Sequence, residues 1–200
     1  MTKLYYTPGA CSLAPHIVLY ESGAAFEAVA VDLRVKKLAD GGDYFAVNPK
    51  GAVPAIGLEN GEVLTENATI LQYLADQSGS EELLPAGGLR RYRVLEWTTF
   101  VSTEIHKGFG PLWNPSTPAE VKAAARETLG KKFDFIEDRL GEGFLTGDAF
   151  TIADAYLFTV LRWTAIHDID LGRWPGLSAY QQRVAARPKV AQALAAESAG

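Results

Sequence analysis

The only cysteine of the chain, Cys11, is the residue whose type and place most clearly suggest chemistry. The apolar stretch 4–6 is followed by a Pro8-Gly9 turn and by a predicted helix that Ser12 could cap. Unpaired N–H groups and the dipole at a helix N-terminus favour an anion, so we expect a lowered thiol pKa and a reactive thiolate. The alternative is that a lone cysteine is simply a small buried apolar side chain.

Histidine is the other residue type that could do chemistry here. His16, His106 and His167 have no metal-ligand spacing among themselves or with Cys11, so we expect no metal site. His106 and Lys107 come near the predicted end of a helix, where positive charge is favourable. Their simplest explanation is therefore structural.

The composition limits the classes of partner. The chain has 200 residues, of which 48% are hydrophobic, so it can bury a substantial core in one domain or two small ones. A net charge of −5 without a block of Lys or Arg argues against nucleic acid or an anionic membrane surface. No apolar run reaches the ~18 residues of a membrane span. We expect a cytoplasmic protein whose partners are small molecules or another protein chain.

The first half of the chain predicts a mixed sheet with helices. A strand over 4–6, a helix ending at 22–23 and a largely buried strand over 26–33 form a βαβ unit with parallel strands. The polar segment 34–49 predicts a loop with one short irregular helix. A hairpin then turns at Asn60-Gly61, and a helix opens at Glu66-Asn67 and ends at 78–79.

The second half predicts helices only, after a linker at 85–88. The expected helices cover 90–107, 118–140, 151–166, 178–186 and 189–197, the last with a frayed end. Thr151 and Asp154 form a capping box, which is a folding signal, and removing either side chain should destabilise the fold by roughly 1 kcal/mol, or more if the site is buried. The interior of this helix is apolar nearly all round, which places it at the centre of its domain.

Several separated motifs carry a family resemblance. Val53-Pro54, ENATILQYL and FTIADAYLF together resemble a glutathione transferase. YYTPGACSL and TEIHKGF are similar to the bacterial beta class, which has cysteine at the thiol site. The resemblance implies a thioredoxin-like α/β domain over residues 1–82, which binds glutathione, and an all-helical domain over 88–200 with a pocket for an electrophile.

The resemblance also assigns the parts of glutathione to residues of the first domain. Family members hold the proline matching Pro54 in cis, so that Val53 N–H and C=O can pair with the cysteinyl portion. Glu66 and Asn67 match the γ-glutamyl site, where a helix N-terminus suits a carboxylate and Glu66 can accept from an ammonium. Lys36 matches a lysine that pairs with the glycyl carboxylate.

In the second domain, the histidine matching His106 faces the glutathione sulfur across the cleft between the domains, where it could donate a hydrogen bond or remove the thiol proton. The other residues assigned to glutathione are Thr99, Thr103, Glu104 and Lys107. Glu104 is expected to reach the site of a partner subunit, which implies a homodimer.

Three positions depart from the family pattern. Asn67 stands where serine or glycine is usual, and Thr99 and Thr103 stand where the beta class tends to have asparagine and serine. Asn67 can still donate its backbone N–H, whereas we expect the glutathione pocket to be rearranged beside Thr99 and Thr103.

The implied reaction is attack of the glutathione thiolate on a hydrophobic electrophile, with glutathione as co-substrate and no cofactor. Candidates for the apolar wall are Phe109, Pro111, Leu112, Trp113 and Trp163. Tyr5 and Tyr6 lie within the first strand, where core packing is the expected role. One alternative is a glutathione-dependent disulfide reductase or peroxidase with Cys11 as nucleophile. Another is a binding or regulatory module that no longer catalyses a reaction.

Overall fold

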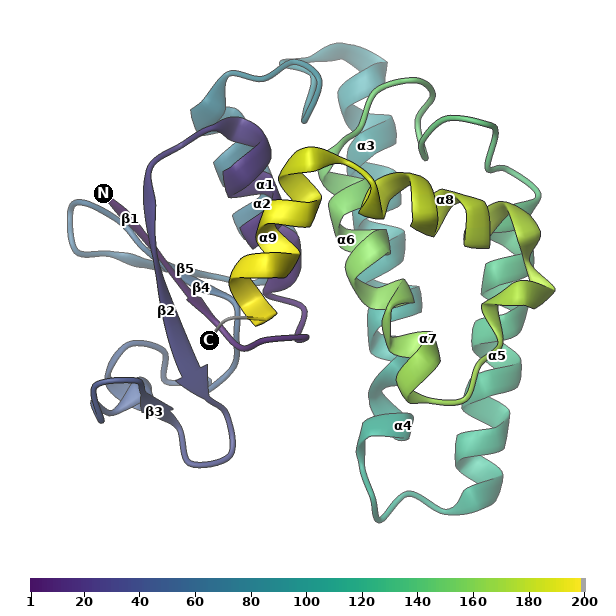
Figure 1. The fold of residues 1–200 in the computed structure, drawn as a ribbon, viewed down its shortest axis with the longest axis horizontal. Helices are drawn as coiled ribbons and strands as arrows, with labels where there is room; N and C mark the ends of the chain where they lie inside the picture. Colours follow the sequence, from purple (N-terminus) through teal and green to yellow (C-terminus); the bar gives the residue numbers. More distant parts are fainter. Residues whose placement is uncertain (199–200) are drawn as a thin grey trace. The chain divides into compact units, whose positions relative to one another are not determined.

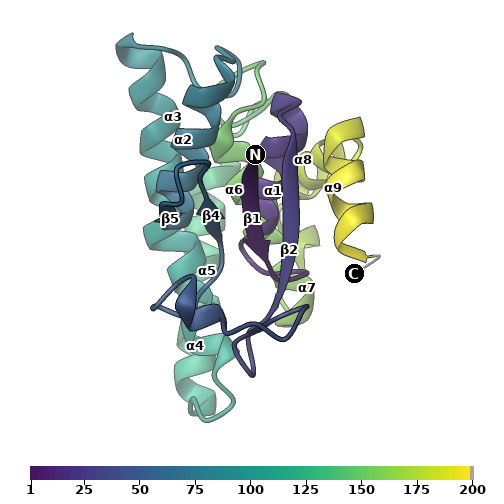
Figure 2. The ribbon, with the colours of Figure 1, turned by 90° about the vertical axis from the view of Figure 1, so that its left-hand side faces the viewer.

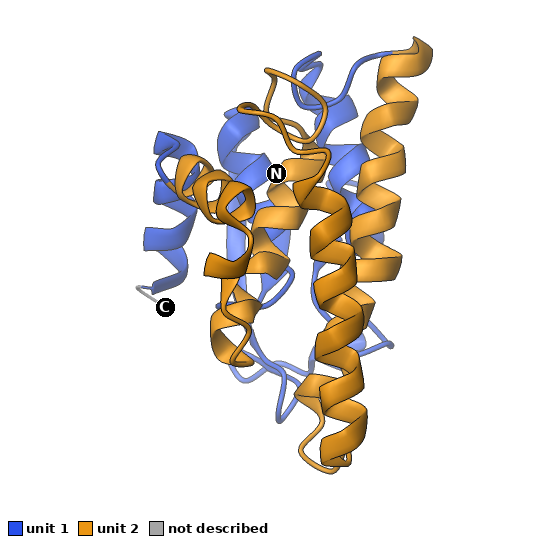
Figure 3. Cartoon of the chain, turned by 90° about the vertical axis from the view of Figure 1, so that its right-hand side faces the viewer, with its two compact units in different colours: residues 1–86, 186–200 blue, residues 87–185 orange. Residues whose placement is uncertain are grey.

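The structure is a computed structural model and describes residues 1–198. It divides into two compact units, one formed by residues 1–86 and 186–198 and the other by residues 87–185 (Figure 3). The resemblance implies that the whole chain from residue 88 forms a helical domain. Helix α9 (Pro188–Ser198) instead packs against α1 (Leu13–Ser22) and belongs to the first unit.

The first unit is built on a five-stranded sheet in the order β3-β2-β1-β4-β5 (Figure 1). The strands are β1 (Thr2–Tyr6), β2 (Phe26–Asp32), β3 (Lys37–Leu38), β4 (Ala55–Gly57) and β5 (Val63–Thr65). β1 and β2 are parallel, and every other neighbouring pair is antiparallel. The predicted βαβ unit and the predicted hairpin are both confirmed.

Two helices of this unit, α1 and α2 (Asn67–Ser78), pack against each other and lie on the same face of the sheet (Figure 2). Each ends at a glycine in the left-handed region, Gly23 with φ of +70° and Gly79 with φ of +64°, as the sequence predicted. The core between them and β1 includes Leu4, Ile17 and Ile70, all 0% exposed. Tyr6 is also buried, in agreement with a packing role.

A buried polar contact explains why α9 joins this unit. Glu197 of α9 lies against His16 of α1, with 3.2 Å between Oε1 and Nδ1. Its other carboxylate oxygen accepts from the Gly9 backbone N–H at 3.0 Å. The last helix, which was predicted over 189–197 with a frayed end, is therefore ordered through Glu197 and holds the turn that precedes Cys11.

On the side of β1 where β2 and β3 lie, the structure differs from the sequence prediction in burial and in strand content. β2 was expected to be largely buried, but only Val31 is buried along it. Its outer neighbour β3 is a two-residue strand that the sequence analysis placed in a loop. Because β3 is so short, β2 lies close to the edge of the sheet and remains accessible along most of its length. The predicted irregular helix is present as the 3-10 turn η1 (Tyr44–Ala46).

The second unit is helical. Its elements are α3 (Gly88–Phe100), η2 (Val101–His106), η3 (Lys107–Phe109), α4 (Gly110–Trp113), α5 (Ala119–Glu137), α6 (Ile152–Leu161), α7 (Trp163–Ile166), η4 (Leu171–Arg173) and α8 (Pro175–Ala185). All ten residues of α6 are buried, as its apolar sequence predicts for a central helix.

The predicted helix over 90–107 does not end there. The chain stays helical from α3 through the wider π-helical turn of η2 and the tighter turn of η3 to the end of α4. The predicted helix over 151–166 is interrupted at Arg162. Within the described residues 1–198, no helix has both the length and the apolar character that crossing a membrane requires.

Candidate active site

Cys11 lies in the turn between β1 and α1 and is partly exposed. Its thiol donates a hydrogen bond to the Val53 carbonyl oxygen, with 3.2 Å between Sγ and O. Ser12 occupies the N-cap position of α1 but makes no side-chain cap, because its hydroxyl is paired with the backbone N–H and C=O of Thr7. The hydrogen bond from Cys11 to Val53 thus links the thiol to the segment that precedes β4.

The expected lowering of the Cys11 pKa is wrong. Burial raises the pKa of the thiol to about 12, and the backbone N–H groups of Cys11 and Ser12 offset only part of this. The negative charge of Glu66 also raises it. The increase in pKa caused by removing water from around the sulfur is therefore larger than the decrease caused by the N–H groups at the helix N-terminus. Cys11 is consequently a neutral thiol at pH 7.

Asn67, at the start of α2, connects that helix to Cys11. Its side-chain Nδ2 donates to the Cys11 carbonyl oxygen at 3.1 Å, and the residue is 7% exposed. The Val53–Pro54 peptide bond is cis, as the resemblance implies. Cys11, Val53 and Asn67 are therefore brought together in the first unit, as expected. The hydrogen bonds that link them were not predicted, since they depend on side-chain direction.

Glu66 precedes α2 with a φ of +75° and makes no helix cap. Its carboxylate pairs with the ammonium of Lys50, which also donates to Thr65 Oγ1 at 3.1 Å. Nothing in the local sequence distinguishes Lys50 from other exposed lysines, so the sequence alone does not predict this contact. Both charged groups of the pair are more than half exposed, so a ligand can reach them.

Lys36 is not simply a solvated lysine. Its backbone has a φ of +54°, and its ammonium donates to the Gly51 carbonyl oxygen at 2.7 Å. Gly51 has a φ of +61°, and a side chain at this position would meet the Phe45 ring. The loop before Val53 is therefore held tightly against Lys36.

In the second unit, the chemistry-bearing residues follow one another along η2 and η3. The His106 Nδ1 lies 2.6 Å from the hydroxyl oxygen of Tyr156 on α6. Burial lowers the pKa of His106 from its ordinary value. The chain stays helical past Gly108, so His106 and Lys107 do not lie at a helix C-terminus. Favourable positive charge at a helix end therefore does not explain why these two residues occur here. Gly108 instead allows the close approach of Leu129, whose Cδ2 would lie 2.8 Å from an added Cβ.

The neighbouring polar residues make contacts within this unit. The Glu104 carboxylate pairs with the Lys132 ammonium on α5. The Thr103 hydroxyl donates to the Thr99 carbonyl oxygen at 3.1 Å. Thr99, Thr103 and Lys107 are exposed.

The candidate apolar wall is mostly core. Phe109 is 0% exposed, while Trp163 and Leu112 are also buried. Trp113 is 46% exposed and packs edge-on against Trp163 and His167. Among these residues, Trp113 is the one with substantial apolar surface left for a ligand.

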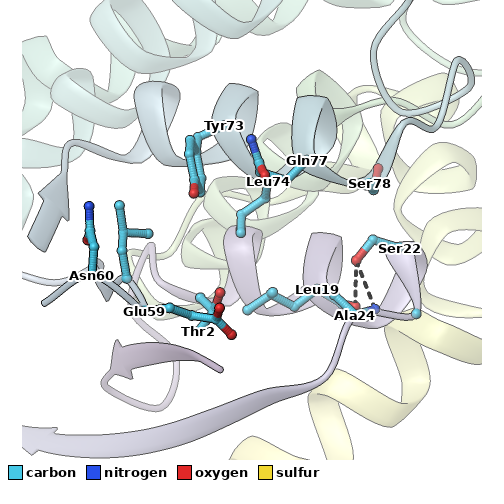
Figure 4. A pocket seen from close by; sticks show the side chains of 12 residues that line it. Thr2, Leu19, Ser22, Ala24, Glu59, Asn60, Tyr73, Leu74, Gln77 and Ser78 are labelled. Carbon is cyan, nitrogen blue, oxygen red and sulfur yellow. Dashed lines mark hydrogen bonds between the residues drawn. The ribbon is translucent and has the colours of Figure 1, made fainter. Parts of the chain in front are cut away.

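A cavity of about 580 Å³ opens in the first unit (Figure 4). It lies at the C-terminal ends of α1 and α2, where Ser22, Tyr73 and Gln77 line it together with Glu59 from the hairpin. Cys11 is at the opposite end of α1, and none of the predicted site residues lines this cavity. It is therefore separate from the candidate site.

Comparisons with known proteins agree with this arrangement. Residues 9–77 match the N-terminal domain of glutathione S-transferases, and residues 100–188 match the C-terminal domain. The chain is 51% identical to glutathione S-transferase GstA of Escherichia coli O157:H7 over 98% of both chains.

Solved structures give the same picture. A beta-class glutathione S-transferase of Sphingomonas chungbukensis has 46% identity and a TM-score of 0.92 over 98% of each chain. A sphingomonad glutathione S-transferase complexed with glutathione has 48% identity and a TM-score of 0.95, over 99% of this chain and 100% of that one. The chain therefore belongs to the glutathione S-transferase family and is a glutathione transferase.

Proposed function

We propose that the protein conjugates glutathione to hydrophobic electrophiles and that Cys11 holds the glutathione sulfur as a neutral hydrogen-bond donor. The observation that carries this proposal is the Cys11 thiol, whose pKa burial raises to about 12 and whose single S–H, donated to Val53 O in the free protein, turns to the glutathione sulfur when glutathione binds. A neutral thiol can donate to a bound thiolate, whereas thiol–disulfide exchange needs Cys11 itself as the thiolate. In the conjugation, the glutathione thiolate forms a sulfur–carbon bond while the leaving group departs with its electron pair.

The first test is intact-protein mass spectrometry after incubation with oxidised glutathione, beside initial rates of conjugation to 1-chloro-2,4-dinitrobenzene. We expect conjugation without accumulation of a covalent adduct. A single glutathione adduct that is lost in Cys11→Ala, together with weak conjugation, would instead favour the reductase or peroxidase alternative. Absence of any glutathione binding would favour the non-catalytic alternative.

For glutathione itself, we propose that Glu66 accepts from the α-ammonium and that the backbone N–H of Asn67 binds the α-carboxylate. The Lys50–Glu66 ion pair supports this, because it demonstrates that the Glu66 carboxylate can engage an ammonium. Val53 and Lys36 are proposed for the cysteinyl and glycyl portions, and Thr99, Thr103 and Lys107 for further contacts. Once the Cys11 S–H turns to the glutathione sulfur, both the backbone N–H and the C=O of Val53 are available to the cysteinyl portion.

Glu66→Gln should raise the glutathione Kd about tenfold, because a hydrogen bond to a charged group contributes about 1.5 kcal/mol or more. Isothermal titration calorimetry measures this. The same substitution should leave binding of glutaryl-cysteinylglycine, which lacks the amino group, within about twofold.

Lys50→Gln is the matched control for this experiment, since it breaks the same exposed ion pair but keeps the Glu66 carboxylate. Exposed ion pairs contribute about 0–1 kcal/mol, so we expect less than about a fivefold change in Kd. Equal losses in Glu66→Gln and Lys50→Gln would contradict the assignment of Glu66 to the ligand ammonium.

We also propose a homodimer in which Glu104 contributes to the partner's site. An aromatic groove of about 450 Å³ between α3 and α5 supports such an interface; it is lined by Arg93, Glu96, Trp97, Phe100, Phe135, Arg139 and Leu145. Nearby on α3, Leu89 and Tyr92 are 68% and 67% exposed. Sedimentation equilibrium measures the mass of the assembly directly.

A further inference from the structure

The imidazole of His106 is held from two sides within the second unit. Tyr156 of α6, which is 1% exposed, lies 2.6 Å from Nδ1 through its hydroxyl. Its ring stands nearly perpendicular to the imidazole, at 81° with centroids 5.7 Å apart. Trp163 of α7 packs on the same ring at 4.9 Å and 69°. The orientation of the His106 ring is therefore fixed by the buried central helix and its neighbour.

The chemistry of the two groups decides which atom donates. Burial lowers the pKa of His106, so the ring is neutral at pH 7 and carries one N–H. A phenol, with a pKa of about 10, is a much stronger acid than a neutral imidazole N–H, and an imidazole lone pair is the better acceptor. The Tyr156 hydroxyl is thus expected to donate to Nδ1, which leaves the imidazole hydrogen on Nε2.

The other ring nitrogen is the one that can meet a ligand. His106 is partly exposed, and within residues 1–198 its hydrogen bonding is confined to the contact between Nδ1 and Tyr156. Nε2 is not among the buried unpaired atoms of the described chain. An accessible N–H donor on a rigidly held ring is suited to a negatively charged sulfur.

We propose that Tyr156 is a positioning residue that holds His106 as the Nε2–H tautomer, so that His106 donates a hydrogen bond to the glutathione thiolate and does not accept the thiol proton. The sulfur keeps the electron pair of the S–H bond, and the proton leaves to solvent water. His106 stays neutral throughout. Only the identity of the ligand atom rests on the proposed function, because the tautomer is a property of the free protein.

Two-bond ¹H–¹⁵N correlation spectra of the ¹⁵N-histidine-labelled free protein test the tautomer directly. The His106 signals are assigned by their loss in His106→Gln. We expect Nε2 to be protonated and Nδ1 to be unprotonated at pH 7. A spectrum in which Nδ1 carries the hydrogen would overturn the proposal, whatever the enzyme assays give.

Tyr156→Phe removes the hydroxyl and keeps the ring. Loss of the bond to Nδ1 should populate both tautomers and raise the pKa of His106, because that bond favours the neutral ring. We expect kcat for conjugation to fall about tenfold, equivalent to about 1.4 kcal/mol, while KM for glutathione changes less than about twofold. An unchanged kcat in the presence of mixed tautomers would contradict the role of Tyr156.

Thr159→Val is the matched control. Thr159 is a buried hydroxyl on the same helix, and it donates to the Ala155 carbonyl oxygen at 2.8 Å. This variant loses a buried hydroxyl from α6 but should keep the His106 tautomer and kcat. If His106→Gln leaves kcat unchanged, the assignment of His106 to the reaction fails, and the tautomer result stands separately.

Discussion

Alkylation of Cys11 by iodoacetamide is expected to be about a hundredfold slower at pH 7 than alkylation of an ordinary cysteine. Burial raises the pKa of this thiol to about 12, against about 8.5 for an unperturbed cysteine, so its thiolate is about three thousandfold scarcer. A more basic thiolate is a better nucleophile, which offsets this by about fortyfold. The scarcity of the thiolate is therefore the larger effect, and the rate should rise about tenfold per pH unit between pH 7 and 11.

Mass spectrometry of the alkylated protein measures this rate without ambiguity, because the chain contains one cysteine. The same chain unfolded in guanidinium chloride is the control, since its thiol is exposed to water. A rate that reaches a plateau near neutral pH would contradict a neutral thiol and would support the reductase alternative.

The raised pKa of Cys11 should also make the folding stability fall as the pH rises. The folded pKa of Cys11 lies above the unfolded value, so the unfolded chain loses its proton first as the pH rises. This contribution to stability is fully present below about pH 8.5 and is lost as the pH rises toward 12. Cys11→Ala should remove this part of the alkaline pH dependence.

Asp154→Ala should lower the free energy of unfolding by about 4 kcal/mol, which is a large part of the stability of an ordinary domain. The Asp154 carboxylate is 0% exposed and accepts from Leu145 N and Thr151 N, each at 2.9 Å. It also accepts from the hydroxyls of Thr151 at 2.7 Å and Tyr180 at 2.9 Å. The substitution leaves these donors buried without their acceptor, so the loss far exceeds that of a helix cap alone.

Asp170→Ala is the control for this prediction. Asp170 also caps a helical turn through Gly172 N at 2.9 Å, but it is exposed, so the expected loss is about 1 kcal/mol. Urea denaturation monitored by circular dichroism measures both variants. Similar losses in the two variants would mean that the buried network adds little to the capping box.

Local signals in the sequence predict most of the secondary structure, and its separated motifs predict the family. Asn60-Gly61 predicted the hairpin, the left-handed glycines predicted the ends of α1 and α2, and Thr151 with Asp154 predicted the start of α6. These signals are local, because they depend on the backbone conformation that a residue prefers or on neighbours within one turn. The apolar sequence of α6 likewise predicted its central position.

The protonation and hydrogen bonding of the site residues depend on tertiary contacts that local sequence does not specify. The pKa of Cys11 depends on how much water the fold removes from the sulfur, and this term reverses the effect of the helix N-terminus. Lys50 meets Glu66, Tyr156 meets His106, and Glu197 meets His16 through contacts that span 16, 50 and 181 residues. Such pairs are set by side-chain direction and packing between distant elements, and no local pattern in the sequence specifies them.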